Sequence, residues 1–227
     1  MALGAQILVD TSIFNHANFL KGTWQSSGQA LWGGRIPIDN GQLITSEDES
    51  PAYQERHYLA ALILEHRSKR IKFYTSDALN IERTSSKNLR PKSFGGANIF
   101  NQMQLETLET LDGFSFVISK HAPSPLESLR DFLRASDDEH FRYVLKHLDQ
   151  NEKSNQDAWH LATVLRYDLH GFMTLDKKFL NKISAKCEDL GKRVVTPKLL
   201  CERLDVPRLC EDEFQSFVND FKFSFVN

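Results

Sequence analysis

Short apolar runs rich in β-branched and aromatic residues alternate along the chain with longer segments of helical periodicity. These runs predict strands, and they cover residues 7–9, 71–76, 114–118, 171–175 and 193–197. The run at 7–9 is Ile-Leu-Val without a polar position, which is typical of a central strand buried on both faces. Residues 36–38 predict a brief edge strand.

A period of 3.6 residues marks the predicted helices. In the segment 155–165, Ala158, Leu161, Ala162 and Leu165 fall on one face, so this helix should pack against the sheet. The other predicted helices cover residues 11–20, 53–68, 77–85, 125–134, 138–148, 177–183 and 200–204. Between 21 and 50 the periodicity is lost, which predicts a long irregular connection.

The alternation of strands and helices decides the fold class. Strands separated by helices form parallel pairs through right-handed crossovers. We therefore expect an α/β fold of three layers, α/β/α, with a central, mostly parallel sheet.

Composition narrows the class of protein. Of the 227 residues 41% are hydrophobic, which is enough for a sizeable core and argues against intrinsic disorder. The formal net charge of −2 means that contact with nucleic acid would need a local basic patch. Three cysteines without CxxC spacing favour a reduced, cytoplasmic protein. We expect no signal peptide and no membrane segment, because no apolar run approaches roughly 20 residues.

Four acidic residues stand where predicted strands and helices meet. Asp10 and Asp176 end strands, Asp157 is in the first turn of a helix, and Glu82 lies on the apolar stripe of the helix after 71–76. Residues at the carboxyl ends of parallel strands gather at one edge of the sheet, where open α/β sheets bind their ligands. The sequence therefore predicts an acidic cleft.

Carboxylates that converge in this way need a compensating cation, because a half-buried acid is costly unless it is paired, protonated or bound to a cation. Oxygen ligands without Cys or an obligatory His favour a hard ion, Mg²⁺ or Mn²⁺. Mg²⁺ held by few carboxylates keeps waters and leaves room for phosphate oxygens. Such ions promote in-line displacement at phosphodiesters.

Each acid also has a local alternative. Asp10 and Asp176 are placed to cap the helices that follow them, and Ser154-Asn155-Gln156-Asp157 fits the S-x-x-D form of a capping box. Glu82 at the margin of its stripe would reach water. Helix capping alone would not place acids at the ends of strands and a further acid on the inward-facing stripe of a helix. A shared site therefore explains the four positions better than capping does.

The order and spacing of these motifs resemble those of a known protein family. An apolar strand ends in Asp10-Thr11-Ser12, and Glu82 stands six residues after the strand-ending Ser76. Asp157 opens an Ala- and Leu-rich helix, and Thr174-x-Asp176-x-x-Phe follows it. Together these motifs resemble the PIN-domain nucleases, named after the PilT N-terminus. The resemblance covers the beginning of the chain, residues 71–86 and residues 155–204, whose end is similar to the family's closing strand and helix.

This resemblance implies a Mg²⁺- or Mn²⁺-dependent endoribonuclease that cuts single-stranded or structured RNA. Many small relatives are toxins of toxin–antitoxin pairs, inhibited by a partner peptide in the acidic cleft, and many dimerise. A toxin role, an antitoxin or other protein partner and a homodimer are therefore expectations as well. Where some relatives carry a further acid this chain has Lys177, which favours one metal ion over two.

Relative to the compact toxins, this chain carries insertions near 21–52 and 88–113. We expect a PIN-like nuclease domain over residues 1–207. The remaining residues, 208–227, form a Phe-rich tail that packs on the domain or on a partner.

The expected roles follow from the motifs. Asp10, Asp157 and Asp176 are predicted metal ligands, and Glu82 is a ligand or orients the bound water. The remaining predicted site residues support the carboxylates by hydrogen bonds (Thr11, Ser12, Thr174) or hold the substrate backbone (Lys87, Arg90, Lys92).

Alternatives stay open at this point. His160 and His170 are interpreted as packing or surface residues. A catalytically inactive PIN-like module that binds RNA or protein is one alternative function. A phosphatase or DNA-directed nuclease at the same sheet edge is another, because fold does not fix function.

Overall fold

The computed structural model describes most of the chain. The described residues are 4–17, 20–31, 36–45, 51–85, 100, 103, 105–117, 122–148 and 152–223, and side chains are described for 4–17, 53–85, 100, 103, 105–117, 122–148 and 153–220.

Helices and strands alternate through the described chain. In order they are β1 (Ala5–Val9), α1 (Thr11–His16), β2 (Leu20–Leu31), β3 (Ile36–Thr45), α2 (Pro51–Arg67), β4 (Ile71–Ser76), α3 (Asp77–Ser85), β5 (Glu106–Leu108), α5 (Pro125–Ala135), α6 (Glu139–Leu145), α7 (Glu152–Arg166), β6 (Gly171–Met173), α8 (Lys177–Lys186), α9 (Glu188–Lys192), β7 (Val194–Val195), α10 (Pro197–Arg203) and α11 (Glu211–Phe223).

The central sheet has five strands in the order β5-β4-β1-β6-β7, and every pair is parallel. The first strand lies at its centre, because Ile7 is the register partner of Phe73 in β4 on one side and of Gly171 in β6 on the other. Leu8 and Val9 are fully buried, as expected for a strand covered on both faces. The predicted three-layer α/β/α class is confirmed, and its sheet is entirely parallel.

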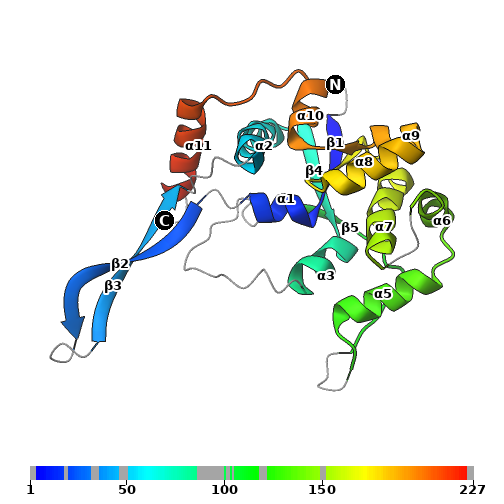
Figure 1. The fold of residues 1–227 in the computed structure, drawn as a ribbon, viewed down its shortest axis with the longest axis horizontal. Helices are drawn as coiled ribbons and strands as arrows, with labels where there is room; N and C mark the ends of the chain where they lie inside the picture. Colours follow the sequence, from blue (N-terminus) through cyan, green and yellow to red (C-terminus); the bar gives the residue numbers. More distant parts are fainter. Residues whose placement is uncertain are drawn as a thin grey trace.

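Helices cover both faces of this sheet (Figure 1). Successive side chains of a strand point to opposite faces. Ile7 and Val9 accordingly pack into one core with α1, α2, α10 and α11. Leu8 packs into the other core with α3 and α5 to α9. The alternation along β1 thus divides the hydrophobic interior into two layers.

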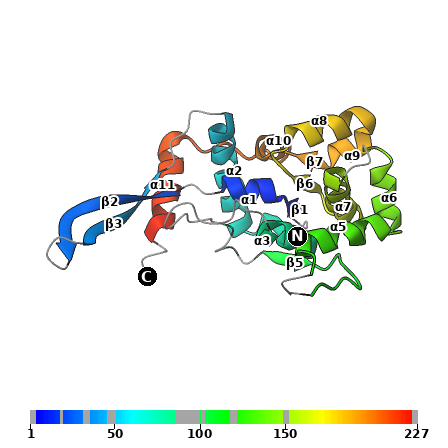
Figure 2. The same ribbon diagram turned by 60° about the horizontal axis from the view of Figure 1, so that its bottom comes forward.

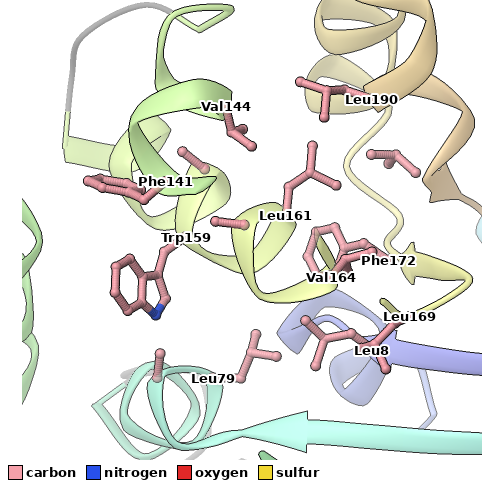
Figure 3. Packing of buried hydrophobic residues seen from close by; sticks show 14 of the residues in the cluster. Leu8, Leu79, Phe141, Val144, Trp159, Leu161, Val164, Leu169, Phe172 and Leu190 are labelled. Carbon is pink, nitrogen blue, oxygen red and sulfur yellow. The ribbon is translucent and has the colours of Figure 1, made fainter. Parts of the chain in front are cut away.

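The helix α7 fills the second core. Figure 3 shows its Trp159, Leu161 and Val164 between the sheet and the neighbouring helices. Trp159 is 2% exposed, and its ring meets that of Phe141 edge-on with centroids 5.3 Å apart. This packing fixes how far α7 extends along the sheet and where its polar side reaches the sheet edge.

The segment near 21–52, predicted as an irregular connection with a brief edge strand, is an antiparallel hairpin. Strands β2 and β3 pair with each other in a separate two-stranded sheet, with an irregularity in register between Ser26 and Gln29. In Figures 1 and 2 the hairpin extends away from the central sheet. The prediction missed it because these strands contain Gly, Pro, Asp and Asn residues, which are depleted in strands generally.

The strand predicted at 114–118 is wrong for its described residues. Residues 114–117 form no strand, and Phe116 and Val117 are 40% and 73% exposed. The edge strand is β5 instead, within the segment that the sequence reading treated as an insertion, and Thr107 is the register partner of Thr75. Its sequence Glu-Thr-Leu has neither an apolar run nor enough length to show alternation.

The Phe-rich C-terminal segment contains the helix α11. Phe214 is 1% exposed and belongs to the same core as α2, where its ring stacks on His57 with centroids 4.2 Å apart. Phe217 is also buried in this core.

None of the helices in the described ranges combines the length and apolar composition needed to cross a membrane.

Candidate functional site

The candidate site lies at the carboxyl edge of the sheet, where β1 and β6 end side by side. Val9 and Met173 are register partners, and the Asp10 amide donates a hydrogen bond to the Met173 carbonyl at 3.0 Å. This contact holds the chain just after β1 against the chain just after β6. Asp10 and Thr174, which are 164 residues apart in sequence, are therefore neighbours.

The Asp10 carboxylate is oriented by two hydroxyl groups. Its Oδ2 accepts hydrogen bonds from Ser12 Oγ at 2.5 Å and from Thr174 Oγ1 at 2.6 Å. Ser12 Oγ in turn accepts the Leu175 amide at 3.0 Å. In contrast, Thr11 Oγ1 is buried without a hydrogen-bond partner among the described residues, so it does not support the carboxylate. Asp10 occupies the N-cap position of α1 but makes no side-chain cap, so the capping alternative is wrong for this residue.

Asp176 is both a cap and an ion-pair partner. Its Oδ1 accepts the Phe179 amide at 3.0 Å at the start of α8, as the capping alternative predicts. Its Oδ2 lies 2.5 Å from Lys153 Nζ. Burial acts to raise the pKa of Asp176, but the hydrogen bonds from Lys153 and from the Phe179 amide outweigh it and lower the pKa. The carboxylate is thus held in its charged form.

Asp157 lies further into its helix than the sequence predicts. Because α7 begins at Glu152, Ser154 is inside the helix and the predicted capping box does not exist. The Asp157 side chain is half-buried and makes no hydrogen bond within the described part of the chain. Burial raises its pKa to about 6, while His160 and Lys153 act to lower the pKa. A half-buried carboxyl without a hydrogen-bond donor is a costly arrangement that marks candidate functional sites.

Lys153 connects the acids, and sequence reasoning missed it. It stands four residues before Asp157, so both lie on one side of α7. The hydrogen bond to Asp176 raises the pKa of Lys153, and the charges of Asp157, Asp176 and Asp10 act on it as well. Lys153 therefore contacts Asp176 and lies in the electrostatic field of Asp10 and Asp157. The i, i+4 spacing of Lys153 and Asp157 was the available signal.

Glu82 lies on α3 and pairs with a buried histidine of the site. Its Oε1 lies 2.9 Å from His160 Nε2, and the two side chains are 17% and 2% exposed. Burial acts to lower the pKa of His160, but the charge of Glu82 and its hydrogen bond outweigh burial and raise the pKa. The charges of Asp10 and Asp157 act in the same direction. The packing role predicted for His160 is only part of its role, because it also binds Glu82.

The four predicted acids share an electrostatic environment without forming a ready-made ligand set. Within the described ranges, no group of three or more His, Cys, Asp or Glu side chains is arranged to hold a metal ion. The donors fit a hard cation in chemical type, because all are carboxylates. Their arrangement instead holds the ammonium group of Lys153 against Asp176.

Another acid at the same sheet edge has a structural role. Asp77 follows β4 directly, and its carboxylate accepts the amides of Ala78 at 2.8 Å, Thr110 at 2.9 Å and Leu111 at 3.0 Å, together with the Thr110 hydroxyl. These bonds tie the chain after β5 to the start of α3. Asp77 is therefore satisfied by the protein itself, unlike Asp157.

The predicted substrate contacts Lys87, Arg90 and Lys92 lie outside the described residues.

Comparisons of the chain with protein-family models, with curated proteins and with solved structures gave no match.

Proposed function

We propose that the acidic edge is the active site of a Mg²⁺- or Mn²⁺-dependent endoribonuclease that hydrolyses phosphodiester bonds. The observation that carries the proposal is that the Lys153 ammonium group binds Asp176 at the carboxyl edge of the sheet and feels the charges of Asp10 and Asp157. Carboxylates that share one electrostatic environment favour a cation there. The position at the carboxyl edge of a parallel sheet agrees with ligand binding there.

The protein's own residues have separable roles in this proposal. Ser12 and Thr174 fix Asp10 by binding its Oδ2, and no hydrogen bond within the described part of the chain engages its Oδ1. Asp157, which has no hydrogen-bond donor among the described residues, would gain a partner from a bound cation. Asp176, held by its cap to α8, would be the third residue to hold the ion.

Glu82 is the fourth acid of the proposed site. Its contact with His160 leaves Glu82 Oε2 to orient a water or to act as a further ligand. A bound Mg²⁺ or Mn²⁺ supplies an activated water and stabilises the negative charge of in-line displacement. The resemblance of the motifs to PIN-domain nucleases supports RNA as the substrate.

Cleavage of unstructured RNA tests the proposal. Asp10→Asn and Asp157→Asn should each reduce Mn²⁺-dependent cleavage by at least about 100-fold, because each removes a ligand charge. Circular dichroism should show that both variants keep the fold. Asp220→Asn, an exposed acid on α11, is the matched control and should cleave like the wild type. Cleavage that survives both changes, or that persists in excess chelator, overturns the proposal.

A non-catalytic module that binds RNA or protein is the second candidate. The Lys153–Asp176 ion pair favours it, because this pair already neutralises part of the acidic edge. Thermal unfolding with increasing Mn²⁺ separates the two functions. A metal enzyme gains stability with metal concentration through ligand linkage, whereas a module without a metal site shows no rise.

A further inference from the structure

A basic pocket lies at the end of the sheet opposite the acidic edge. It has a volume of about 610 Å³ and is lined by His66, Arg67, Lys69, Ile71, Lys72 and Met103. This volume falls within the range of ligand sites in proteins. The acidic edge is at the carboxyl end of β4 and the pocket is at its amino end, so the length of β4, roughly 17 Å, separates them.

The turn between α2 and β4 creates the pocket. Arg70 donates its amide to the Glu65 carbonyl at 3.0 Å, and Lys69 adopts the left-handed conformation with φ 64°. This is the C-terminal motif in which glycine is strongly preferred, because a side chain at this φ is strained. Lys69 is exposed. A lysine at this position costs stability relative to glycine.

The charge of the pocket is only partly neutralised by the protein. Lys72 pairs with Glu106 at 2.5 Å, and the Arg67 guanidinium lies 5.7 Å from the centre of the Phe217 ring. In the described part of the chain Lys69 has no carboxylate partner. Ile71 and Met103 also line the pocket, so it combines positive and apolar side chains. This combination suits a ligand with phosphates and flat, weakly polar groups.

We propose that this basic pocket binds the phosphodiester backbone of single-stranded RNA, with Lys69 contacting a phosphate. The identity of the anion as RNA rests on the proposed function. An RNA strand held here would pass along the sheet toward the acidic edge, so the pocket would anchor substrate at a distance from the cleavage site. Phosphate contacts of this kind position a strand and are independent of its sequence.

Lys69→Gly tests the pocket without endangering the fold. Glycine is unstrained at this φ, so the melting temperature should stay the same or rise. Binding is measured by fluorescence anisotropy with a labelled oligouridylate of about 12 nucleotides. The measurement is made in chelator, so that the RNA stays intact. We expect the Kd to rise by about three- to tenfold, and the slope of log K against log salt to fall by about 0.7, the value for one lost phosphate contact.

Lys146→Gln is the matched control, because it removes one exposed positive charge at the C-cap of α6, and this helix packs on the other face of the sheet. Its Kd and salt slope should equal those of the wild type. Equal Kd and slope for Lys69→Gly and the wild type overturn the proposal. Binding of polyglutamate that depends on Lys69, without binding of RNA, also overturns it and indicates an acidic protein segment instead.

The two proposals fail in different ways. Weaker RNA binding by Lys69→Gly together with no cleavage in Mn²⁺ supports the pocket and rejects the nuclease. Cleavage by the wild type, together with RNA binding that is unchanged in Lys69→Gly, supports the nuclease and rejects the pocket.

Discussion

The Nζ atom of Lys153 lies 2.5 Å from Oδ2 of Asp176 and is also within the electrostatic reach of Asp10 and Asp157. A divalent cation at this edge and the Lys153 ammonium group would bind the same carboxylates. The two cations would therefore compete, and the binding of metal would require the displacement of Lys153. Because the lysine side chain is 69% exposed, it can swing into water at low cost.

Lys153→Gln should therefore bind Mn²⁺ more tightly than the wild type. Loss of a partly exposed ion pair is worth about 1 kcal/mol, which corresponds to roughly a fivefold lower Kd. Isothermal titration calorimetry measures the change. Lys146→Gln removes the same charge elsewhere and should leave the Kd unaltered. Weaker Mn²⁺ binding by Lys153→Gln would mean that Lys153 assists the metal instead of competing with it.

The pKa of Asp157 predicts a pH dependence of stability. The pKa is about 6 in the folded protein and about 3.9 in an unfolded chain, so the folded state binds more protons between these values. The free energy of unfolding should fall as pH rises from about 4 to about 6, by on the order of 2 to 3 kcal/mol from this group. Asp157→Asn should lack this fall. Urea unfolding across the window, without metal, measures the difference, and parallel curves for the two proteins would contradict it.

His160 predicts a pH dependence at higher values. Because its pairing with Glu82 raises its pKa, the stabilisation is fully present below the unfolded value of about 6.5 and is lost as pH rises through the folded pKa. His160→Gln keeps a hydrogen-bonding side chain but cannot be charged. Thermal unfolding from about pH 6 upward should show a decline in the wild type that the variant lacks. The same decline in both proteins would show that the charged form of His160 does not stabilise the fold.

Asp77→Asn should destabilise the fold. The carboxylate accepts bonds from three amides and a hydroxyl, and the amide side chain offers one acceptor oxygen and no charge. We expect a loss of about 2 to 4 kcal/mol in the free energy of unfolding, measured with urea. Asp131→Asn changes an acid that is 69% exposed and should stay within about 0.5 kcal/mol of the wild type. A small effect at Asp77 would show that these bonds are replaceable by water.

The sequence predicts the parallel sheet well where side chains are buried on both faces. The strands β1 and β4 carry Ile7, Leu8 and Phe73 in runs that no helix period explains, and both strands lie where the runs predict. The edge strand β5 is missed because Leu108 is its only buried residue. The run at 114–117 has the composition of a strand, but its backbone has no partner in the described sheet.

The acids of the candidate site can be predicted from the sequence, but the residues that contact these acids are harder to predict. Asp10 and Asp176 follow strands, and topology alone brings them to one edge. The contacts of Lys153 and His160 depend on where α7 begins and on how its faces are rotated, which Trp159 decides by packing into the second core. Ser154 misled the prediction, because a serine three residues before an acid has the form of a helix start although it lies within the helix.

The hydrogen bond between Asp10 and Thr174 also sets the order in which the protein becomes competent during synthesis. Asp10 leaves the ribosome 164 residues before its partner. At roughly 5 to 20 residues per second, this delay is on the order of ten seconds or more. During this delay the growing chain has no assembled acidic edge, and the proposed nuclease would be inert toward the messenger RNA that encodes it.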